Sequence, residues 1–168
     1  GWISRTSMGR AVLMLKRFYK YRESMAGKRT FKESEASYKF NIGRALISCK
    51  IDRIETTVDG KLYIVDFKTG KSAISVEDAK TDAQMQIYQY AVGPDVAGAS
   101  LVYLDHDLKG NKTRDQQPID RKVVEERIQR TAVLMGGKSY LAVQNKNCQF
   151  CNVASSCPIQ IEGRGLYE

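Results

Sequence analysis

Two turn signals divide the middle of the chain into three segments with strand character. Residues 36–42 and 45–56 are separated by Gly43-Arg44, and residues 62–68 follow Val58-Asp59-Gly60-Lys61. An Asp-Gly pair readily adopts the positive φ angles of a tight hairpin, so successive segments should pair as antiparallel strands. The middle of the chain therefore predicts a meander of three strands.

Helical segments are predicted before and after this meander. The sequence predicts one helix over residues 6–26. Ser75 can cap a second helix that runs to about residue 92, before Gly93-Pro94. Three further segments follow: an apolar strand at 99–105, a polar loop at 106–117 and a long helix at 119–135. A meander followed by a helical crossover gives an α/β fold in which helices flank a mixed β-sheet.

Length and charge narrow the class of protein. The chain has 168 residues and a formal net charge of +8. We expect a single domain, 1–168, taken from a longer protein, because this length supports one core and Gly1-Trp2 is not a natural start. Residues 1–30 hold eight Lys and Arg against one acid, Glu23. This predicted basic N-terminal helix either lies on a phosphate backbone or is a solvated amphipathic helix, and the two interpretations are compatible.

The cysteines favour a metal centre over disulfides. Cys148, Cys151 and Cys157 form a C-x2-C-x5-C pattern in a predicted C-terminal loop, 145–168, while Cys49 stands alone. The chain has no signal-peptide pattern and no apolar run near the ~20 residues that cross a bilayer, so we expect a cytoplasmic protein without a membrane partner. Close thiols in such a protein suggest metal binding. Spacing alone does not separate zinc from an iron–sulfur cluster, and we interpret Cys49 as a small buried residue.

Charged side chains gather where the third predicted strand ends. Asp66 and Lys68 share one face of this strand, because side chains alternate and Phe67 faces the other way. Asp52 lies seven residues before Asp59 and Asp66 six after Gly60, so the hairpin places the two carboxylates nearly opposite each other.

Facing carboxylates repel unless a cation lies between them, and oxygen ligands favour Mg²⁺ or Mn²⁺. The Phe67 carbonyl is a further candidate ligand, and Lys68 can orient a water or stabilise charge on a phosphate oxygen. The simpler alternative is a salt bridge between Lys68 and one of the aspartates.

The segment from Asp52 through the turn to Asp66-Phe67-Lys68 resembles the core of the PD-(D/E)XK nuclease superfamily, in its RecB/AddB branch. Gln84 and Tyr88 match the Q-x-x-x-Y helix motif of that branch, in the same order along the chain. The C-x2-C-x5-C pattern resembles the end of AddB-type nucleases and of CRISPR adaptation nucleases, where it holds an iron–sulfur cluster.

The resemblance implies a restriction-endonuclease-like fold and a Mg/Mn-dependent deoxyribonuclease, acting as an exonuclease or an endonuclease. Asp52 and Asp66 would be metal ligands, Lys68 the catalytic lysine, and Gln84 and Tyr88 substrate-binding residues. A 4Fe-4S cluster, or alternatively Zn²⁺, would be bound by Cys148, Cys151 and Cys157. DNA and a helicase domain or subunit of the same complex would be the partners, in DNA end processing and repair.

The sequence departs from this branch at two positions. RecB-type domains carry a histidine upstream of the first strand, whereas the single histidine here is His106, which we interpret as a loop residue. Glu35, or its neighbour Glu33, is the candidate for the missing metal ligand. No cysteine precedes Cys49, so the fourth cluster ligand is unassigned. A non-catalytic DNA-binding relic of the fold and a stand-alone CRISPR-type exonuclease are the alternative functions.

Overall fold

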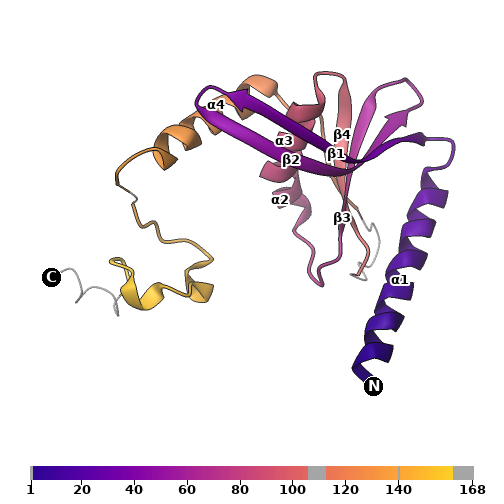
Figure 1. The fold of residues 1–168 in the computed structure, drawn as a ribbon, viewed down its shortest axis with the longest axis horizontal. Coiled ribbons are helices and arrows are strands. Elements are labelled where there is room, and N and C mark those ends of the chain that lie inside the picture. The colour runs from indigo at the N-terminus through magenta and orange to yellow at the C-terminus, as the bar shows by residue number, and fades with distance from the viewer. Residues whose placement is uncertain (1, 106–112, 140, 161–168) are drawn as a thin grey trace. The chain divides into compact units, whose positions relative to one another are not determined.

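The computed structural model of the protein describes residues 2–105, 113–139 and 141–160. The chain divides into two compact units, a first unit at residues 1–129 and a second unit at 130–168. The helices and strands run, in chain order, α1 (Trp2–Met25), β1 (Arg29–Ile42), β2 (Ala45–Thr57), β3 (Leu62–Lys68), α2 (Val76–Lys80), α3 (Ala83–Val92), β4 (Val96–Tyr103), β5 (Thr113–Gln116) and α4 (Arg121–Met135) (Figure 1).

The strands form one mixed sheet in the order β1-β2-β3-β4-β5. Neighbouring strands are antiparallel except β3 and β4, which are parallel because α2 and α3 make the crossover between them. The fold is therefore α/β, a five-stranded mixed sheet flanked by helices, as predicted. The division at residue 129 leaves the expectation of a single domain, 1–168, as a prediction.

Alternation along β3 assigns the two faces of the sheet to different helices. Ile64 is fully buried in a cluster with Met85 and Tyr88 of α3, whereas Val65 is fully buried in a cluster with Tyr21 of α1. Asp66 follows Val65 and therefore leaves the strand on the α3 face. Asp66 is only 3% exposed, because α3 covers this face of the sheet.

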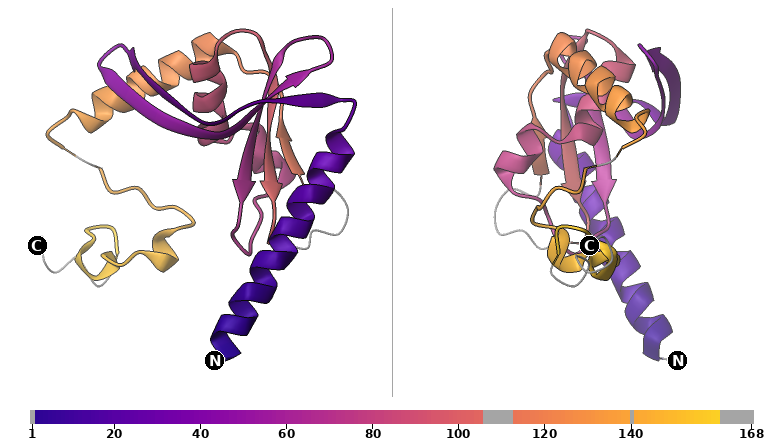
Figure 2. Two further views of the ribbon diagram at one scale, coloured as in Figure 1. Left: turned by 45° about the vertical axis from the view of Figure 1, so that its right-hand side comes forward. Right: turned by 90° about the vertical axis from the view of Figure 1, so that its left-hand side faces the viewer.

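Polar contacts join α1 to the carboxyl ends of β3 and β4. Arg10 donates to the Asp105 carboxylate and to the Thr69 carbonyl, both at 2.9 Å. Arg17 donates to the Leu104 carbonyl at 2.8 Å. Figure 2 shows α1 running alongside these strands. The basic residues of α1 thus serve in part to hold the helix on the sheet, which the sequence did not reveal.

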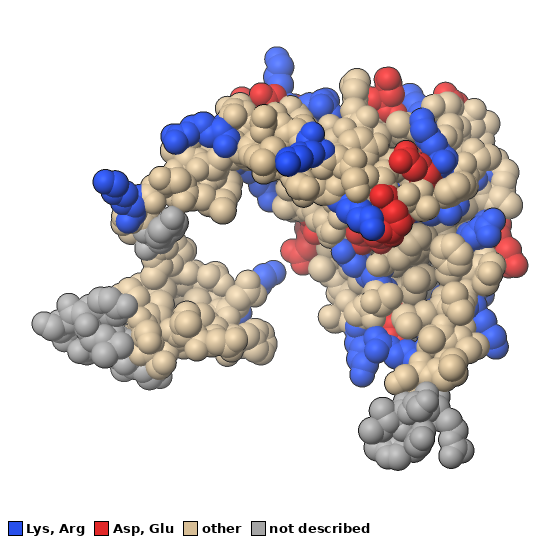
Figure 3. All heavy atoms as spheres, viewed as in Figure 1, with Lys and Arg blue, Asp and Glu red and all other residues tan. Residues whose placement is uncertain are grey.

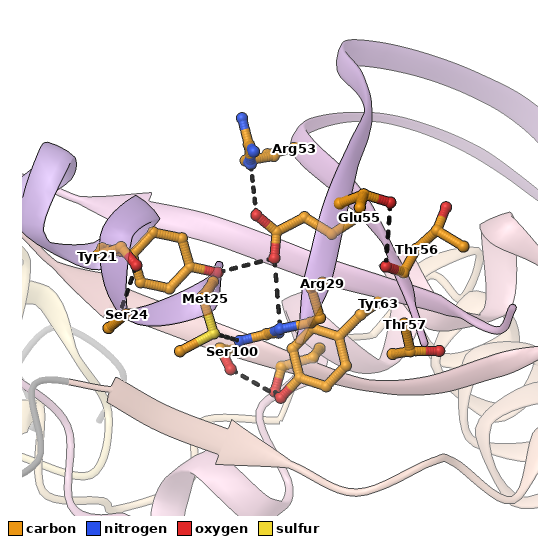
Figure 4. A network of polar contacts seen from close by, with 12 residues as sticks. Tyr21, Ser24, Met25, Arg29, Arg53, Glu55, Thr56, Thr57, Tyr63 and Ser100 are labelled. Carbon is orange, nitrogen blue, oxygen red and sulfur yellow. Dashed lines mark hydrogen bonds and ion pairs between the residues drawn. The ribbon is translucent and has the colours of Figure 1, made fainter. Parts of the chain in front are cut away.

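A buried charge network holds the other end of α1 (Figure 4). The Glu55 carboxylate, 2% exposed, accepts hydrogen bonds from the Tyr21 hydroxyl at 3.0 Å and from Arg53 Nε at 2.7 Å. Arg29 Nε lies 3.4 Å from the same carboxylate, and its guanidinium lies over the Tyr63 ring. One carboxylate therefore ties α1 to β1 and β2.

Three predicted boundaries are wrong, each for a local reason. The first strand begins at Arg29 rather than at residue 36, since an edge strand tolerates the exposed polar residues before Ala36. The helix predicted from residue 76 to 92 is broken at Thr81, and Asp82 starts α3 by accepting a hydrogen bond from Met85 N at 2.9 Å. Residues 113–116 of the predicted polar loop form β5, while His106 lies outside the described residues.

The described part of the second unit contains the cysteine-rich segment. After α4 the chain makes two short 3-10 turns, Cys148–Phe150 and Ala154–Ser156. Across the described residues, no helix combines the length and the apolar character needed to cross a bilayer.

Candidate active site

The structure brings Asp52 and Asp66 together across β2 and β3. The antiparallel register pairs Arg53 with Val65, and one step further along the strands lie Asp52 and Asp66. Asp52 Oδ2 accepts a hydrogen bond from the Phe67 backbone N at 2.9 Å. This bond holds the Asp52 carboxylate against β3, beside Asp66.

Asp66 is a buried carboxylate with an oxygen, Oδ2, that accepts no hydrogen bond from the described residues. Its Oδ2 lies 2.8 Å from Lys68 Nζ, at the distance of an ion pair. Apart from this ion pair, Oδ2 has no polar partner among the described residues. Burial raises the pKa of Asp66 and the charge of Asp52 adds to the rise, although Lys68 opposes both.

Lys68 connects the aspartates to α3. Burial would lower the pKa of Lys68, but the contact with Asp66 and its negative charge outweigh burial and raise that pKa. The ammonium group therefore stays charged at neutral pH, with Nζ donating to Gln84 Oε1 at 2.7 Å. Gln84 Nε2 in turn donates to the Tyr88 hydroxyl at 2.8 Å.

Gln84 and Tyr88 lie on one face of α3 because they are four residues apart. Gln84 is exposed, whereas Tyr88 is 8% exposed. Burial raises the pKa of Tyr88, and the negative charges of Asp66 and Asp52 raise it further, so the hydroxyl stays protonated. The result is a continuous polar row from Asp66 through Lys68 and Gln84 to Tyr88.

Comparison with known proteins assigns the chain to a family. Residues 1–158 match the model of the PD-(D/E)XK nuclease superfamily. The chain belongs to this superfamily. The crystal structure of SSO0001 resembles it with a TM-score of 0.50 and 18% sequence identity, over 90% of this chain and 69% of the other. At that identity the likeness supports the fold alone. No curated protein matches the chain.

Members of this superfamily are generally metal-dependent nucleases, and the two aspartates suit a hard divalent cation. Both supply carboxylate oxygens, the ligands that Mg²⁺ and Mn²⁺ prefer. The buried Asp66 Oδ2 accepts no hydrogen bond from the described residues, and burial together with the charges of Asp52 and Asp82 raises the pKa of Asp66, so a cation beside it would relieve this repulsion. The residues present therefore fit such an ion. The Phe67 carbonyl as a further ligand stays a prediction.

Glu35 does not join the two aspartates. Its neighbours Ser34 and Ala36 pair with Arg53 and Ile51, so Glu35 stands opposite Asp52 in the register. Its side chain is nevertheless 61% exposed and forms an ion pair with Lys50. Its φ angle of 57° also sets it apart from an ordinary strand residue. In the part of the chain that the structure describes, no three His, Cys, Asp or Glu side chains are arranged to hold a metal ion.

Among the described residues, the three C-terminal cysteines are likewise not arranged to hold a metal ion. Cys148, Cys151 and Cys157 are free thiols in the described structure, and they are not gathered into a ligand set. The geometry thus does not show the cluster that the spacing predicts. Cys49, expected to be buried, is half-buried, and this partial burial raises the pKa of its thiol.

Asp82 is a site neighbour that the sequence reasoning missed. Its side chain caps α3, and its charge acts on both Asp66 and Lys68, raising the pKa of each. An aspartate three residues before Met85 is a helix-start signal that was available in the sequence. It was overlooked because the cap at Ser75 predicted one continuous helix.

Proposed function

We propose that the protein is a Mg/Mn-dependent deoxyribonuclease, and that it works as the nuclease module of a RecB/AddB-type helicase–nuclease. The observation that carries the proposal is the connected row of Asp52, Asp66, Lys68, Gln84 and Tyr88. Two motifs, one on β3 and one on α3 of the crossover, contribute to one polar row, which a structural salt bridge does not require.

Each residue of the row has a proposed role. Asp52 and Asp66 would hold the cation, which when bound supplies a Lewis acid for water activation and for the leaving oxygen. Lys68 presents a charged ammonium group that can donate to a non-bridging phosphate oxygen as negative charge builds there. Gln84 fixes the position of Lys68 Nζ and, with Tyr88, offers polar groups to the substrate backbone.

DNA as the substrate is supported by charge. The chain carries a formal net charge of +8, concentrated in residues 1–30. Positive charge of this kind raises the encounter rate with a phosphate backbone and makes binding sensitive to salt. On the face shown in Figure 3, Lys and Arg lie beside Asp and Glu over the first unit. The helicase partner and the role in DNA end processing rest on the resemblance of the motifs, and the cytoplasmic location stays an expectation from the sequence.

The test is hydrolysis of labelled single- and double-stranded DNA with Mn²⁺ or Mg²⁺. We expect cutting that Asp66→Asn and Lys68→Ala each reduce by at least about 100-fold, since each removes a group from the reacting centre. Asp59→Asn, at an exposed turn position with a side chain 64% exposed, is the charge-matched control and should cut normally. Cutting that survives both site substitutions would refute the assignment.

A non-catalytic relic of the fold is the second candidate. It is favoured by the gathering of only two carboxylates among the described residues, with Glu35 turned to Lys50. The relic predicts DNA binding that weakens with salt and no hydrolysis with either metal. The same assay separates the two functions.

We also propose a 4Fe-4S cluster at Cys148, Cys151 and Cys157, with Zn²⁺ as the alternative. Their spacing supports it, although the described geometry does not gather the three thiols. Metal analysis and an absorption spectrum of anaerobically purified protein decide the matter. Iron with sulfide and a brown chromophore would indicate a cluster, a colourless zinc-loaded sample would indicate zinc, and a metal-free sample would refute both.

A further inference from the structure

A pocket of about 500 Å³ lies between α1 and the sheet, on the face of β3 that is turned away from the candidate active site. Arg17 and Lys20 of α1 form part of its wall, and Tyr63 of β3 and Leu104 form part of its floor. Tyr63 and Asp66 leave β3 on opposite faces, because three steps separate them. None of the pocket's described lining residues belongs to the polar row, so the pocket is a separate site.

The size and the lining of the pocket suit an organic ligand. Its volume lies within the range of about 300–1,000 Å³ that is usual for ligand sites. Met25 and Tyr63 are half-buried in its lining, and Val102 and Leu104 are buried beneath it. A bare ion gains nothing from such apolar and aromatic side chains, whereas the body of an organic molecule is stabilised by contact with them.

Positive charge is in excess at this pocket. Arg17, Lys20 and Arg29 line it, and Asp115 is the one acidic residue among its described lining residues. Three cations and one carboxylate leave two positive charges. Arg17 Nη1 donates to the Leu104 carbonyl at 2.8 Å, a contact that fixes the guanidinium at the pocket wall. The pocket therefore favours a ligand that carries negative charge.

Arg29 brings a buried part of this positive charge. Its side chain is 12% exposed, and its guanidinium lies 3.9 Å from the centroid of the Tyr63 ring (Figure 4). The Glu55 carboxylate is shared between Arg29 and Arg53, so these three side chains carry one positive charge in excess. Arg29 Nη1 is buried without a hydrogen-bond partner among the described residues. An anion beside Arg29 would balance a charge that is costly to bury uncompensated.

Asp115 limits how much negative charge the pocket accepts. Its carboxylate is exposed on β5 and accepts a hydrogen bond from Ser100 Oγ at 2.6 Å, which holds it at the pocket floor. A polyanion such as a nucleic acid strand brings further charges toward this carboxylate and is repelled. One phosphomonoester group carries about −1.5 to −2 at neutral pH, which matches the two positive charges in excess.

We propose that this pocket binds a small phosphomonoester with an organic body, of the class of a nucleoside monophosphate. The phosphate lies against Lys20 and Arg29, whose planar guanidinium can donate two parallel hydrogen bonds to it. The body lies against Met25 and Tyr63. This inference goes beyond the proposed nuclease activity and does not depend on it, because the ligand occupies the other face of the sheet.

Titration calorimetry with deoxycytidine monophosphate tests the pocket. The protein is first freed of metal by dialysis, so that the nucleotide cannot bind through an ion at the two aspartates. We expect the nucleotide to bind at least about 10-fold more tightly than deoxycytidine, which lacks the phosphate, and than inorganic phosphate, which lacks the body. Affinity no higher than that of either fragment, or no binding at all, overturns the inference. So does displacement of the nucleotide by an oligothymidylate, since the pocket would then accept a nucleic acid backbone.

Two charge reversals on α1 locate the site. Lys20→Glu, at an exposed position that lines the pocket, should weaken binding of the nucleotide at least about 10-fold, since a carboxylate replaces a phosphate-binding ammonium. Arg22→Glu changes the charge of the chain equally, at an exposed position about 200° around the helix that does not line the pocket, and should bind normally. Equal weakening by both would show that only the overall charge matters, and would refute the pocket.

The outcome for the pocket is distinguishable from the outcome for the nuclease. Binding of the nucleotide is measured without metal and without hydrolysis, on a face that carries no member of the polar row. A protein that binds the nucleotide but does not cut DNA leaves the pocket standing and refutes the nuclease. A protein that cuts DNA but does not bind the nucleotide does the reverse.

Discussion

Replacement of Glu55 by glutamine should destabilise the protein by about 3 kcal/mol. The change keeps the shape of the side chain and removes its charge from between Arg29 and Arg53, whose side chains are only 12% and 13% exposed. Breaking a buried ion pair costs about 3–5 kcal/mol, because it leaves a buried charge without its partner. The residual exposure of both arginines places the cost at the lower end. Against a total stability of about 5–15 kcal/mol for a domain, such a loss is large.

Urea unfolding followed by circular dichroism measures this cost. With a slope of about 2 kcal/mol per molar urea, the midpoint should fall by about 1.5 M without a change of slope. Glu33→Gln, at an exposed position on β1, removes the same charge and should leave the midpoint unchanged. A loss below about 1 kcal/mol for Glu55→Gln would show that water screens the two arginines, and that the network does not hold α1 by charge.

Three further changes test other parts of the structure. Gly98→Ala should lower the free energy of unfolding by at least about 2 kcal/mol in the same assay, because φ at Gly98 is 143° and a Cβ would lie 2.7 Å from a carbonyl oxygen of β5. Gly9→Ala in α1 is the control: a Cβ there meets open space, and the protein should become slightly more stable. Burial and the charge of Glu55 raise the pKa of Tyr21, so the neutral hydroxyl supports the fold, and this support is lost as the pH rises above the unfolded value of about 10. In Tyr21→Phe the fall of stability with alkaline pH should therefore be shallower by up to about 1.4 kcal/mol per pH unit. Tyr19→Phe, at an exposed position, is the control. Mn²⁺ should raise the melting temperature of the wild-type protein and chelation should reverse the rise, while Asp66→Asn should not respond, since an ion stabilises only the state that binds it.

The strongest sequence signals concerned β3 and its surroundings. The apolar run from Leu62, the Asp-Gly turn and the period of two predicted the strand at 62–68 with its observed bounds. Strand alternation and hairpin register then placed Asp66 and Lys68 on one face and Asp52 opposite. These inferences depend on local geometry, which is nearly the same in every hairpin.

The missed elements depend on contacts that are distant in sequence. β5 has four polar residues, and its buried Gln116 donates to the carbonyls of Ala79 and Asp82 and accepts from Gln89 Nε2. No hydrophobic pattern marks such a strand, because hydrogen bonds rather than apolar packing stabilise its buried side chain. The conformation of Glu35 is likewise invisible in the sequence, since only the register and φ reveal that its carboxylate turns to Lys50 instead of Asp52.

The alternation of β3 separates the proposed catalytic role from the structural one. Tyr63, Val65 and Phe67 point to α1, where the buried charge of Glu55 and apolar packing fix the helix. Asp66 and Lys68 point to α3 and form the polar row. A substitution on the α1 face should therefore lower stability while leaving the row intact at temperatures where the protein stays folded. A substitution such as Gln84→Ala, at an exposed position of the row, should lower activity at little cost in stability, because the ion pair between Lys68 and Asp66 stays in place. The two faces thus make the structural and the catalytic effects of substitutions separable by one pair of measurements, unfolding and hydrolysis, on the same set of variants.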